Sequence, residues 1–546
     1  MFAGRRMVYA IGVIIAAFFS TTSATAHTMI EVPEFDAAKS NIVFQILDHS
    51  KEHSSVIRSM TSEGKQRICK SLSDVRCANL DEYKVEVILP PCSKKSTSLD
   101  YCVRGLEITG RDGKMIPASF LREVRTPKIA ANPTSKIGVG GGISLWKIPP
   151  GKSKDSASEV AAEVSLTYLV TKNRDTNKLN PANLVDFRIA VHPVQYKSGK
   201  FEPLDYVVSN EGSDALGVNP ASGKLDDSSD CHWTEKGLCV LQGHFNEETN
   251  VSIALQMDNR LHGWLSSQIL DMKIQEKKIS ASANLLEISG KASVSSPVYA
   301  IDNIADISKV RELKAAYNRC GNDVLVCPQA FEQYDNIIWE GILTDNLKDA
   351  EYSFGLADVI SNNLTDIQGV DRQWKVSSMP ESAWRKGATW SPCVSNQKSL
   401  TGIVSTNASL YQLNPPQIVG QKLISKVSGA LKNAQSQINR VDYQVAMRAD
   451  ALRCLLKMNV NPGGVKASAS SSAGETLDYP STNIVEQNGW VSFAAKKFSY
   501  STPNIEFAFT TSVSKVASKT ISCTKGKTTV KVKGVTPKCP KGYKKV

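Results

Sequence analysis

Apolar and polar residues alternate with a period of two in many short runs of this chain, which is the pattern of half-buried β-strands. The apolar positions of six such runs are Tyr83, Val85, Val87 and Leu89; Val164, Leu166, Tyr168 and Val170; Val185, Phe187, Ile189 and Val191; Val251, Ile253, Leu255 and Met257; Val441, Tyr443, Val445 and Met447; and Ile505, Phe507 and Phe509. Turn residues lie between them, including GRDG at 110–113 and Asn488-Gly489. The pattern predicts a mainly β protein of several antiparallel β-sandwich-like units with a few helices.

Other stretches depart from this pattern or continue it differently. The run SKVRELKAAYNR at 308–319 has helical spacing, and residues 53–71 and 330–365 are predicted to be helical, or irregular in the second case. Alternation from Leu452 to Val460 predicts a further strand. The Gly/Pro/Ser-rich segment 126–156 is predicted to be a boundary or surface loop. Its GVGGG lacks the last glycine of G-x-G-x-x-G, since Ile143 stands there, so no phosphate site is predicted.

The length of 546 residues is too great for one hydrophobic core. We expect a signal peptide at 1–26, an N-terminal β-rich domain at 27–130 and a β-sandwich-like domain at 131–300. A C-terminal domain with a helical insert and a β-sandwich would follow at 301–512, and a basic module paired by cysteines at 513–546.

The first 26 residues have the three regions of a secretory signal. Arg5 and Arg6 precede an apolar run, and Ala24-Thr25-Ala26 offers a cleavage site. The run is shorter than the roughly 20 residues that a membrane span needs. The sequence therefore predicts export to the extracellular space or the cell wall, with no transmembrane segment in the mature chain.

Cysteine number and spacing favour disulfides. The twelve cysteines are Cys69, Cys77, Cys92, Cys102, Cys231, Cys239, Cys320, Cys327, Cys393, Cys454, Cys523 and Cys539. An exported protein meets an oxidising environment, and no C-x-x-C spacing suggests structural zinc. Spacing alone does not fix the connectivity, but pairing of sequence neighbours would close six loops.

Net charge is concentrated in the tail. The chain carries +12, but removing Arg5, Arg6 and the ten lysines after Glu506 leaves 53 basic against 53 acidic residues. A neutral body argues against a nucleic-acid-binding protein. Alternation around Lys525-Gly526-Lys527 predicts a hairpin that Cys523 and Cys539 would cross-link. An ordered basic hairpin favours an anionic partner such as a cell-wall polymer or surface glycan, and simple solubilisation is the alternative. The candidate envelope-binding residues are Lys525, Lys527, Lys531, Lys533, Lys538, Lys541, Lys544 and Lys545.

No motif for catalysis or for a cofactor stands out. The seven histidines include no HExxH, no G-x-S-x-G is present, and paired cysteines leave no thiol nucleophile. We therefore predict no catalytic residues, cofactor or metal. The sequence offers two weaker metal hypotheses: His27 as a copper-binding amino terminus, similar to that of secreted polysaccharide monooxygenases, and an acidic cluster near Cys231. That cluster comprises Asp226, Asp227, Asp230, His232 and His244. The eight tryptophans are expected to fill the core or, if exposed, to stack on sugars.

The tail carries a family resemblance. ISCTKGKTTVKVKGVTPKCPKGYKK contains C-x-K-G-K followed by P-x-C-P-x-G-Y-K-K, and resembles the C-terminal module of uncharacterised exported actinobacterial surface proteins. RCL at 453–455, NGW at 488–490 and FSYSTPNI at 498–505 are similar to the last β-domain of the same group. The resemblance implies export to the cell surface, and it implies no catalytic residues.

These observations predict an exported, disulfide-bonded surface protein with a binding or structural role and no enzymatic activity. Its basic tail would attach it to the anionic cell envelope. The alternative function is a secreted hydrolase of polysaccharides, whose two carboxylates would leave no local spacing in the sequence.

Overall fold

A computed structural model gives the fold of the chain. It describes residues 41–47, 55–60, 66–93, 101–202, 231–301, 332–343, 366–379, 393, 400–428, 440–456, 465–470, 485–499, 504–511, 519–534 and 539–545, apart from short gaps within these ranges. Within these ranges the protein is mainly β, with large antiparallel sheets and one helix, which confirms the predicted fold class.

The largest sheet runs in the order β3-β2-β4-β9-β10-β21-β14-β22-β26-β29-β28. Its strands are β2 (Val56–Met60), β3 (Gln66–Cys69), β4 (Glu82–Ile88), β9 (Glu159–Thr171), β10 (Asn183–Ser198), β14 (Gly263–Lys278), β21 (Lys375–Ser378), β22 (Leu400–Thr406), β26 (Arg440–Arg448), β28 (Val485–Gln487) and β29 (Trp490–Ser499). Two further strands extend this sheet: β8 (Ser144–Lys147) pairs with the start of β9, and β7 (Ser119–Glu123) pairs with β8. Strands β4, β9, β10 and β26 confirm runs predicted from alternation.

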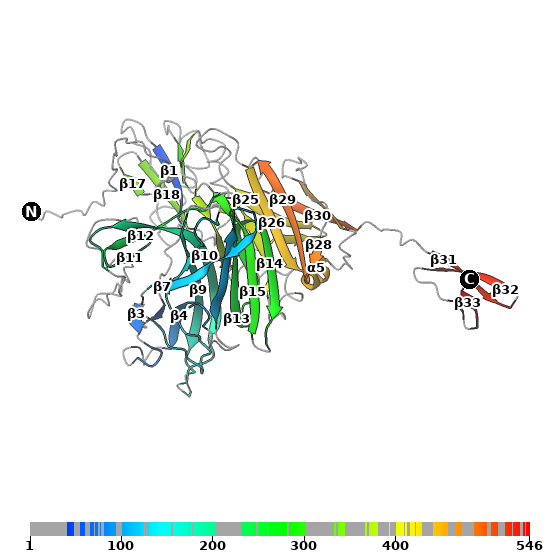
Figure 1. The fold of residues 1–546 in the computed structure, drawn as a ribbon, viewed down its shortest axis with the longest axis horizontal. Helices are drawn as coiled ribbons and strands as arrows, with labels where there is room; N and C mark the ends of the chain where they lie inside the picture. Colours follow the sequence, from blue (N-terminus) through cyan, green and yellow to red (C-terminus); the bar gives the residue numbers. More distant parts are fainter. Residues whose placement is uncertain are drawn as a thin grey trace, which may run out of the picture.

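A second sheet runs in the order β6-β5-β13-β15-β14, so the long strand β14 belongs to both sheets (Figure 1). Its other strands are β5 (Cys102–Thr109), β6 (Met115–Pro117), β13 (Asn250–Asp258) and β15 (Ala283–Ser295), and β20 (Asp371–Gln373) pairs with the end of β15. The predicted turn at 110–113 joins β5 and β6, with Gly113 at φ 80°.

Side chains from both sheets form one hydrophobic core. Val85, Leu166 and Phe187 of the first sheet and Ile253 and Leu286 of the second belong to the same buried cluster. Strands from 27–130 and from 131–300 pair directly here, β4 with β9 and β5 with β13. The boundary expected at residue 130 therefore falls between strands that share a core.

Segment 126–156, expected to be a loop or boundary, contributes the strand β8 and the buried residues Ile143, Leu145 and Trp146. Its glycines allow close packing: a Cβ on Gly140 would lie 2.5 Å from Ser55 Oγ. The Gly142 amide donates to Glu123 Oε1 at 2.7 Å. The Glu123 carboxylate therefore occupies the Gly142 amide, which a bound phosphate would need as a donor.

The C-terminal part builds a second core around β22, β26, β29 and a separate sheet. That sheet runs β23-β25-β30-β27, with β24 beside β25. Its strands are β23 (Leu410–Tyr411), β24 (Gln417–Val419), β25 (Lys422–Ser428), β27 (Val465–Ser470) and β30 (Asn504–Thr511). The predicted Asn488-Gly489 hairpin joins β28 to β29, with both residues at positive φ, as a two-residue turn requires.

The strand expected from Leu452 onward is instead helix α5 (Ala449–Leu456), and the prediction was wrong. Every residue of ADALRCLL except Asp450 and Cys454 has good helix propensity. Leu452, Leu455 and Leu456 are buried while Cys454 is exposed, as a helical face requires. The apparent alternation arose because leucines spaced by four also fit a period of two.

Two stretches expected to be helical, or irregular in the second case, contain strands where the structure describes them. Within 53–71 the described residues include the antiparallel pair β2–β3, and the described part of 330–365 contains β17 (Glu332–Tyr334) and β18 (Ile337–Leu343). These two join β1 (Asn41–Leu47), β16 (Val298–Ile301) and β19 (Asp366–Gln368) in a five-stranded sheet. The helix expected at 308–319 lies outside the described residues.

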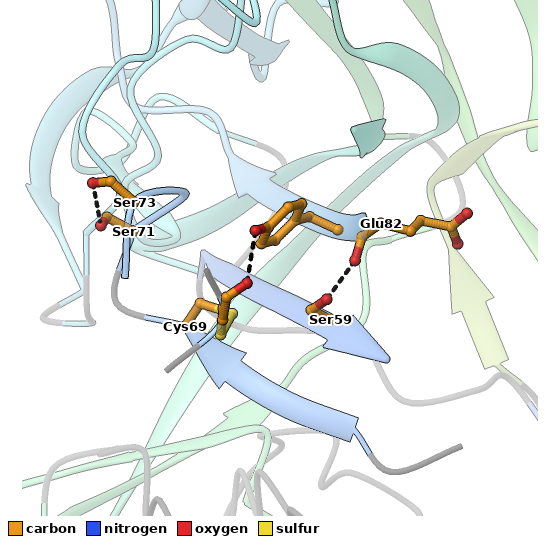
Figure 2. The surroundings of a disulfide bond; sticks show 7 residues. Ser59, Cys69, Ser71, Ser73 and Glu82 are labelled. Carbon is orange, nitrogen blue, oxygen red and sulfur yellow. Dashed lines mark hydrogen bonds between the residues drawn. A yellow bond between two sulfur atoms is a disulfide. The ribbon is translucent and has the colours of Figure 1, made fainter. Parts of the chain in front are cut away.

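Five disulfides join sequence neighbours, as predicted: Cys69–Cys77, Cys92–Cys102, Cys231–Cys239, Cys393–Cys454 and Cys523–Cys539. Cys320 and Cys327 lie outside the described residues. Around Cys69–Cys77, Ser59 Oγ donates to the Glu82 carbonyl, and the Tyr83 hydroxyl donates to the Cys77 carbonyl at 2.8 Å (Figure 2). The disulfide ties the loop to the end of β3, and the Tyr83 hydrogen bond ties the same loop to β4.

Substitution of Gly402 tests the junction between the two cores. A Cβ there would lie 2.4 Å from the ring of Trp264, which is fully buried at the start of β14. We expect Gly402→Ala to lower the free energy of unfolding by about 1–3 kcal/mol, because the ring has no room to move. Urea denaturation followed by tryptophan fluorescence measures the change.

Gly105→Ala in β5 is the matched control, since a Cβ at that position meets no atom within 4 Å. Its effect should stay within about 1 kcal/mol. Equal stability of the Gly402 variant and the wild type would contradict the packing described here.

Candidate functional site

A disulfide-bonded hairpin covers the end of β10. Strands β11 (Trp233–Glu235) and β12 (Leu238–Gln242) pair with each other, and β12 pairs with β10 from Val194 to Ser198. Gly237 provides the turn at φ 77°. The Cys231–Cys239 disulfide and a 2.7 Å hydrogen bond from the His232 amide to the Val240 carbonyl fix the segment just before β11.

Beneath this hairpin, β9 and β10 are buried on both faces. Val164, Leu166 and Ile189 point into the main core, while Ala161 and Val194 belong to a smaller cluster on the opposite face. Trp233 and Val240 of the hairpin complete that smaller cluster. Since successive side chains of a strand point to opposite faces, Glu163 and His192 lie on this second, covered face.

The register of the two long strands brings these polar residues together. Glu163 is opposite Ala190 and His192 is opposite Ala161, so Glu163 and His192 are diagonal neighbours. Their relative exposures are only 5% and 2%. The pairing of β9 with β10 therefore places the Glu163 carboxylate and the His192 imidazole under the hairpin, independently of His232.

His232 completes a three-residue cluster. His192 Nε2 lies 3.0 Å from Glu163 Oε1, and His232 Nε2 contacts the same oxygen. The two imidazole rings meet edge to face with centroids 4.7 Å apart. One donor atom from each residue lies within 4.8 Å of the others. In the part of the chain that the structure describes, this is the group of side chains that could hold a metal ion.

The second ring nitrogen of His192 defines its hydrogen-bonding state. Nδ1 lies 3.0 Å from the Pro193 carbonyl oxygen. A carbonyl oxygen only accepts, so Nδ1 carries the hydrogen in this contact. In a neutral ring Nε2 then directs a lone pair at Glu163 Oε1, and that contact needs either a proton between the two atoms, on the ring or on the carboxyl group, or a metal cation.

Trp233 forms an apolar wall beside the cluster. Its ring centroid lies 5.3 Å from that of His232 and 6.3 Å from that of His192. The indole nitrogen donates to Glu235 Oε1 at 3.1 Å, and Arg122 pairs with the same oxygen at 2.9 Å. The tryptophan is thus fixed in place and keeps water from one side of the imidazoles.

A separate, half-buried polar cluster surrounds Arg260. Its guanidinium donates to the Tyr101 hydroxyl and to the Lys136 and Ala182 carbonyls at 2.6–3.2 Å. It also pairs with Asp258 and lies 5.0 Å from the ring centre of Tyr168. Burial and the hydrogen bond to Asp258 raise the pKa of Tyr101. Because the arginine has this many partners, the cluster reads as a structural cross-link between loops.

The C-terminal module forms a three-stranded antiparallel sheet, β32-β31-β33. Strands β31 (Lys519–Lys525) and β32 (Thr528–Gly534) make the predicted hairpin, and β33 (Lys544–Lys545) adds a third strand that was not predicted. In the described chain these strands pair with no other sheet, and Figure 1 draws them as a unit of their own. Cys523 is buried and bonded to Cys539.

The pairing register separates two faces of this module. Ile521, Cys523, Val530 and Val532 share one face, because Ile521 pairs with Val532 and Cys523 with Val530. The opposite face, which we call the basic face, has only hydroxyl and lysine residues. Its members are Thr520, Ser522, Thr524, Thr529, Lys531, Lys533 and Lys544.

The candidate lysines are placed as follows. Lys525, Lys531, Lys544 and Lys545 are exposed, and Lys533 lies on β32. Lys527, Lys538 and Lys541 lie outside the described residues, as do His27, Asp226, Asp227 and Asp230. Of the acidic cluster expected near Cys231, His232 takes part in the site and His244 does not.

Sequence reasoning missed Glu163 and His192. The signal was present in AAEV at 161–164 and IAVHPV at 189–194, where Glu163 and His192 each interrupt small and apolar residues on both strand faces. Five tryptophans follow the core expectation, because Trp146, Trp233, Trp264, Trp374 and Trp490 are buried, while the burial of the other three is outside what the structure describes.

Comparison with known proteins gave no family model, no curated protein and no solved structure that matches this chain. Among the described residues, none of the helical segments has the length and apolarity needed to cross a bilayer.

Removal of the Cys231–Cys239 disulfide tests how the hairpin is held. Replacing both cysteines by serine should lower the free energy of local opening by roughly 2–4 kcal/mol, because the open loop gains conformational entropy. Hydrogen exchange at the amide of His232 should become faster, since that amide bonds to Val240 only while the hairpin is closed.

Serine replacement of Cys69 and Cys77 is the control, because that disulfide closes a loop of the same sequence separation, 8 residues. It should leave the exchange of the His232 amide unchanged. Unchanged exchange in the Cys231 and Cys239 variant would refute the proposed closure.

Proposed function

We propose that this protein is exported and acts at the cell surface as a binding or structural protein, attached to an anionic envelope polymer through its C-terminal module. The basic face of β31–β33 is the observation that carries the proposal. A solubilising tail needs charge but no fixed arrangement, whereas this module has a disulfide, a paired register and one face made only of lysine and hydroxyl residues.

The chemistry of the basic face suits an anionic polysaccharide or a phosphate-containing wall polymer. The register places Lys531, Lys533 and Lys544 on this face, and it places Thr520 and Ser522 opposite the two lysines of β32. No acidic residue follows Glu506, so nothing in the module neutralises these charges. Such a surface attracts a polyanion electrostatically, and hydroxyl groups add hydrogen bonds to sugar or phosphate oxygens.

The neutral charge of residues 27–506 limits this attraction to the module. Binding should therefore weaken as salt screens the exposed lysines. The resemblance of C-x-K-G-K and P-x-C-P-x-G-Y-K-K to exported actinobacterial modules supports the same location at the cell surface.

The alternative, a secreted polysaccharide hydrolase, requires two opposed carboxyl groups and usually an aromatic platform for the sugar. The five tryptophans whose burial the structure describes are buried, and these five provide no such platform. Attachment is therefore the function that the described residues support better.

Charge removal from one face of the module tests the proposal. The full-length triple variant Lys531→Gln, Lys533→Gln and Lys544→Gln should bind polygalacturonate roughly tenfold more weakly, at about 0.5 kcal/mol for each exposed charge pair. Sedimentation with the polymer at two salt concentrations measures the loss. In the producing cell, the variant should shift from the envelope fraction to the medium.

The matched control is the triple variant Lys519→Gln, Lys525→Gln and Lys545→Gln. It also removes three charges, but from the opposite face of the module, which carries Ile521 and Cys523. It should bind more tightly than the first variant, and neutral dextran should bind to neither protein. Wild-type affinity in both triple variants would sink the attachment proposal.

A further inference from the structure

We propose that Glu163, His192 and His232 form a zinc-binding site that holds the β11–β12 hairpin against the central sheet. This inference goes beyond the proposed attachment and does not depend on it. It rests on the distances between the three candidate ligand atoms, on the hydrogen bond from His192 Nδ1 to the Pro193 carbonyl, and on the burial of the three side chains.

The donor set is the one that zinc prefers. Structural and catalytic zinc sites use imidazole nitrogens and carboxylate oxygens, and two histidines with one glutamate occur as a three-ligand set. Here both imidazoles direct Nε2 toward one carboxylate oxygen, and the donor atoms lie within 4.8 Å of one another. Ligands of a tetrahedral ion are about 3–3.5 Å apart, given bond lengths of about 2.0–2.2 Å. A small shift of side chains would accommodate the ion.

The orientation of His192 is that of a metal ligand. Its Nδ1 donates to the Pro193 carbonyl at 3.0 Å, which leaves Nε2 as the nitrogen with a free lone pair. Metal-binding histidines commonly donate their other ring hydrogen to a backbone carbonyl or a carboxylate in this way. The ion would supply the positive charge that the contact between Nε2 and Glu163 Oε1 needs.

Burial strengthens the case. The side chains of His192 and Glu163 are 3% and 6% exposed, and that of His232 is 10% exposed. A carboxylate so far from water is costly unless it is paired with a cation or with several hydrogen bonds. Zinc would compensate this charge, and three protein ligands would leave a fourth position for water.

Zinc is favoured over iron(II), for which two histidines and one carboxylate are also a known set. The described chain contains five disulfides and no free cysteine, which indicates a protein that matures under oxidising conditions. Zinc has no redox chemistry and is stable in such an environment.

The ligands come from separate segments, so the ion would have a mechanical effect. Glu163 and His192 belong to β9 and β10, whereas His232 directly precedes β11 and follows Cys231. The disulfide closes the hairpin on itself, and zinc would link it to the sheet. Metal binding should then slow hydrogen exchange of the His232 amide.

Titration of the full-length protein tests the site. The protein is treated with a chelator, passed through a desalting column and titrated with zinc chloride in a calorimeter, with metal content checked by mass spectrometry. We expect one equivalent of zinc to bind and to slow exchange of the His232 amide. His232→Ala should weaken this binding by more than about 100-fold, beyond the effect of losing an outer-shell partner.

Glu163→Gln keeps the size of the side chain and should weaken binding similarly, which guards against a folding defect in one variant. His262→Ala is the control, because that histidine lies outside the cluster, and it should bind zinc as the wild type does. Any equivalent bound at His27 would persist in all variants and be subtracted. No zinc equivalent sensitive to both His232→Ala and Glu163→Gln, or a site that takes manganese or iron(II) but not zinc, would overturn the proposal.

Discussion

The pairing of β9 with β10 is the interaction on which the described structure depends. These strands, of 13 and 16 residues, pair over ten positions with a single irregularity. One face supplies Val164, Leu166 and Phe187 to the main core. The other face supplies Ala161 and Val194 to the cluster beneath the hairpin. A strand pair buried on both sides cannot slip by one residue without exchanging its two environments, so burial fixes the register.

That fixed register accounts for the polar cluster. On a covered face a carboxylate must find partners, because water no longer solvates it. The diagonal relation of Glu163 and His192 provides the first partner, and the disulfide-bonded hairpin delivers His232 as the second. A polar pair of this kind costs stability compared with an apolar pair of similar volume. A cation bound by Glu163, His192 and His232 would offset this cost and would account for the polar side chains in an apolar cluster.

The C-terminal module is stabilised differently from the rest of the described chain. Its core is one disulfide and three further apolar residues, so its order depends on Cys523–Cys539 and on strand pairing more than on burial. This leaves nearly all of its surface available for charged groups. The proposed attachment and the proposed zinc site therefore use separate parts of the protein, and each can fail without the other.

The sequence predicts strands best where one face is buried and the other is polar. The runs in β4, β13 and β26 show this, and so does the tail hairpin. It misleads where two periods coincide: the leucines of α5 fit a strand as well as a helix until Cys454 is seen to be exposed. Glycines at 140–142 indicated a loop, but they serve close packing. The cluster of Glu163, His192 and His232 was missed because its members are up to 69 residues apart and meet only through register.

Diffraction from crystals of the zinc-treated protein, recorded on both sides of the zinc absorption edge, tests the central claim most directly. The account predicts an anomalous peak about 2.0–2.2 Å from Glu163 Oε1 and from Nε2 of both His192 and His232. Direct contact of these three groups with no peak between them, in crystals that bind zinc elsewhere, would contradict it.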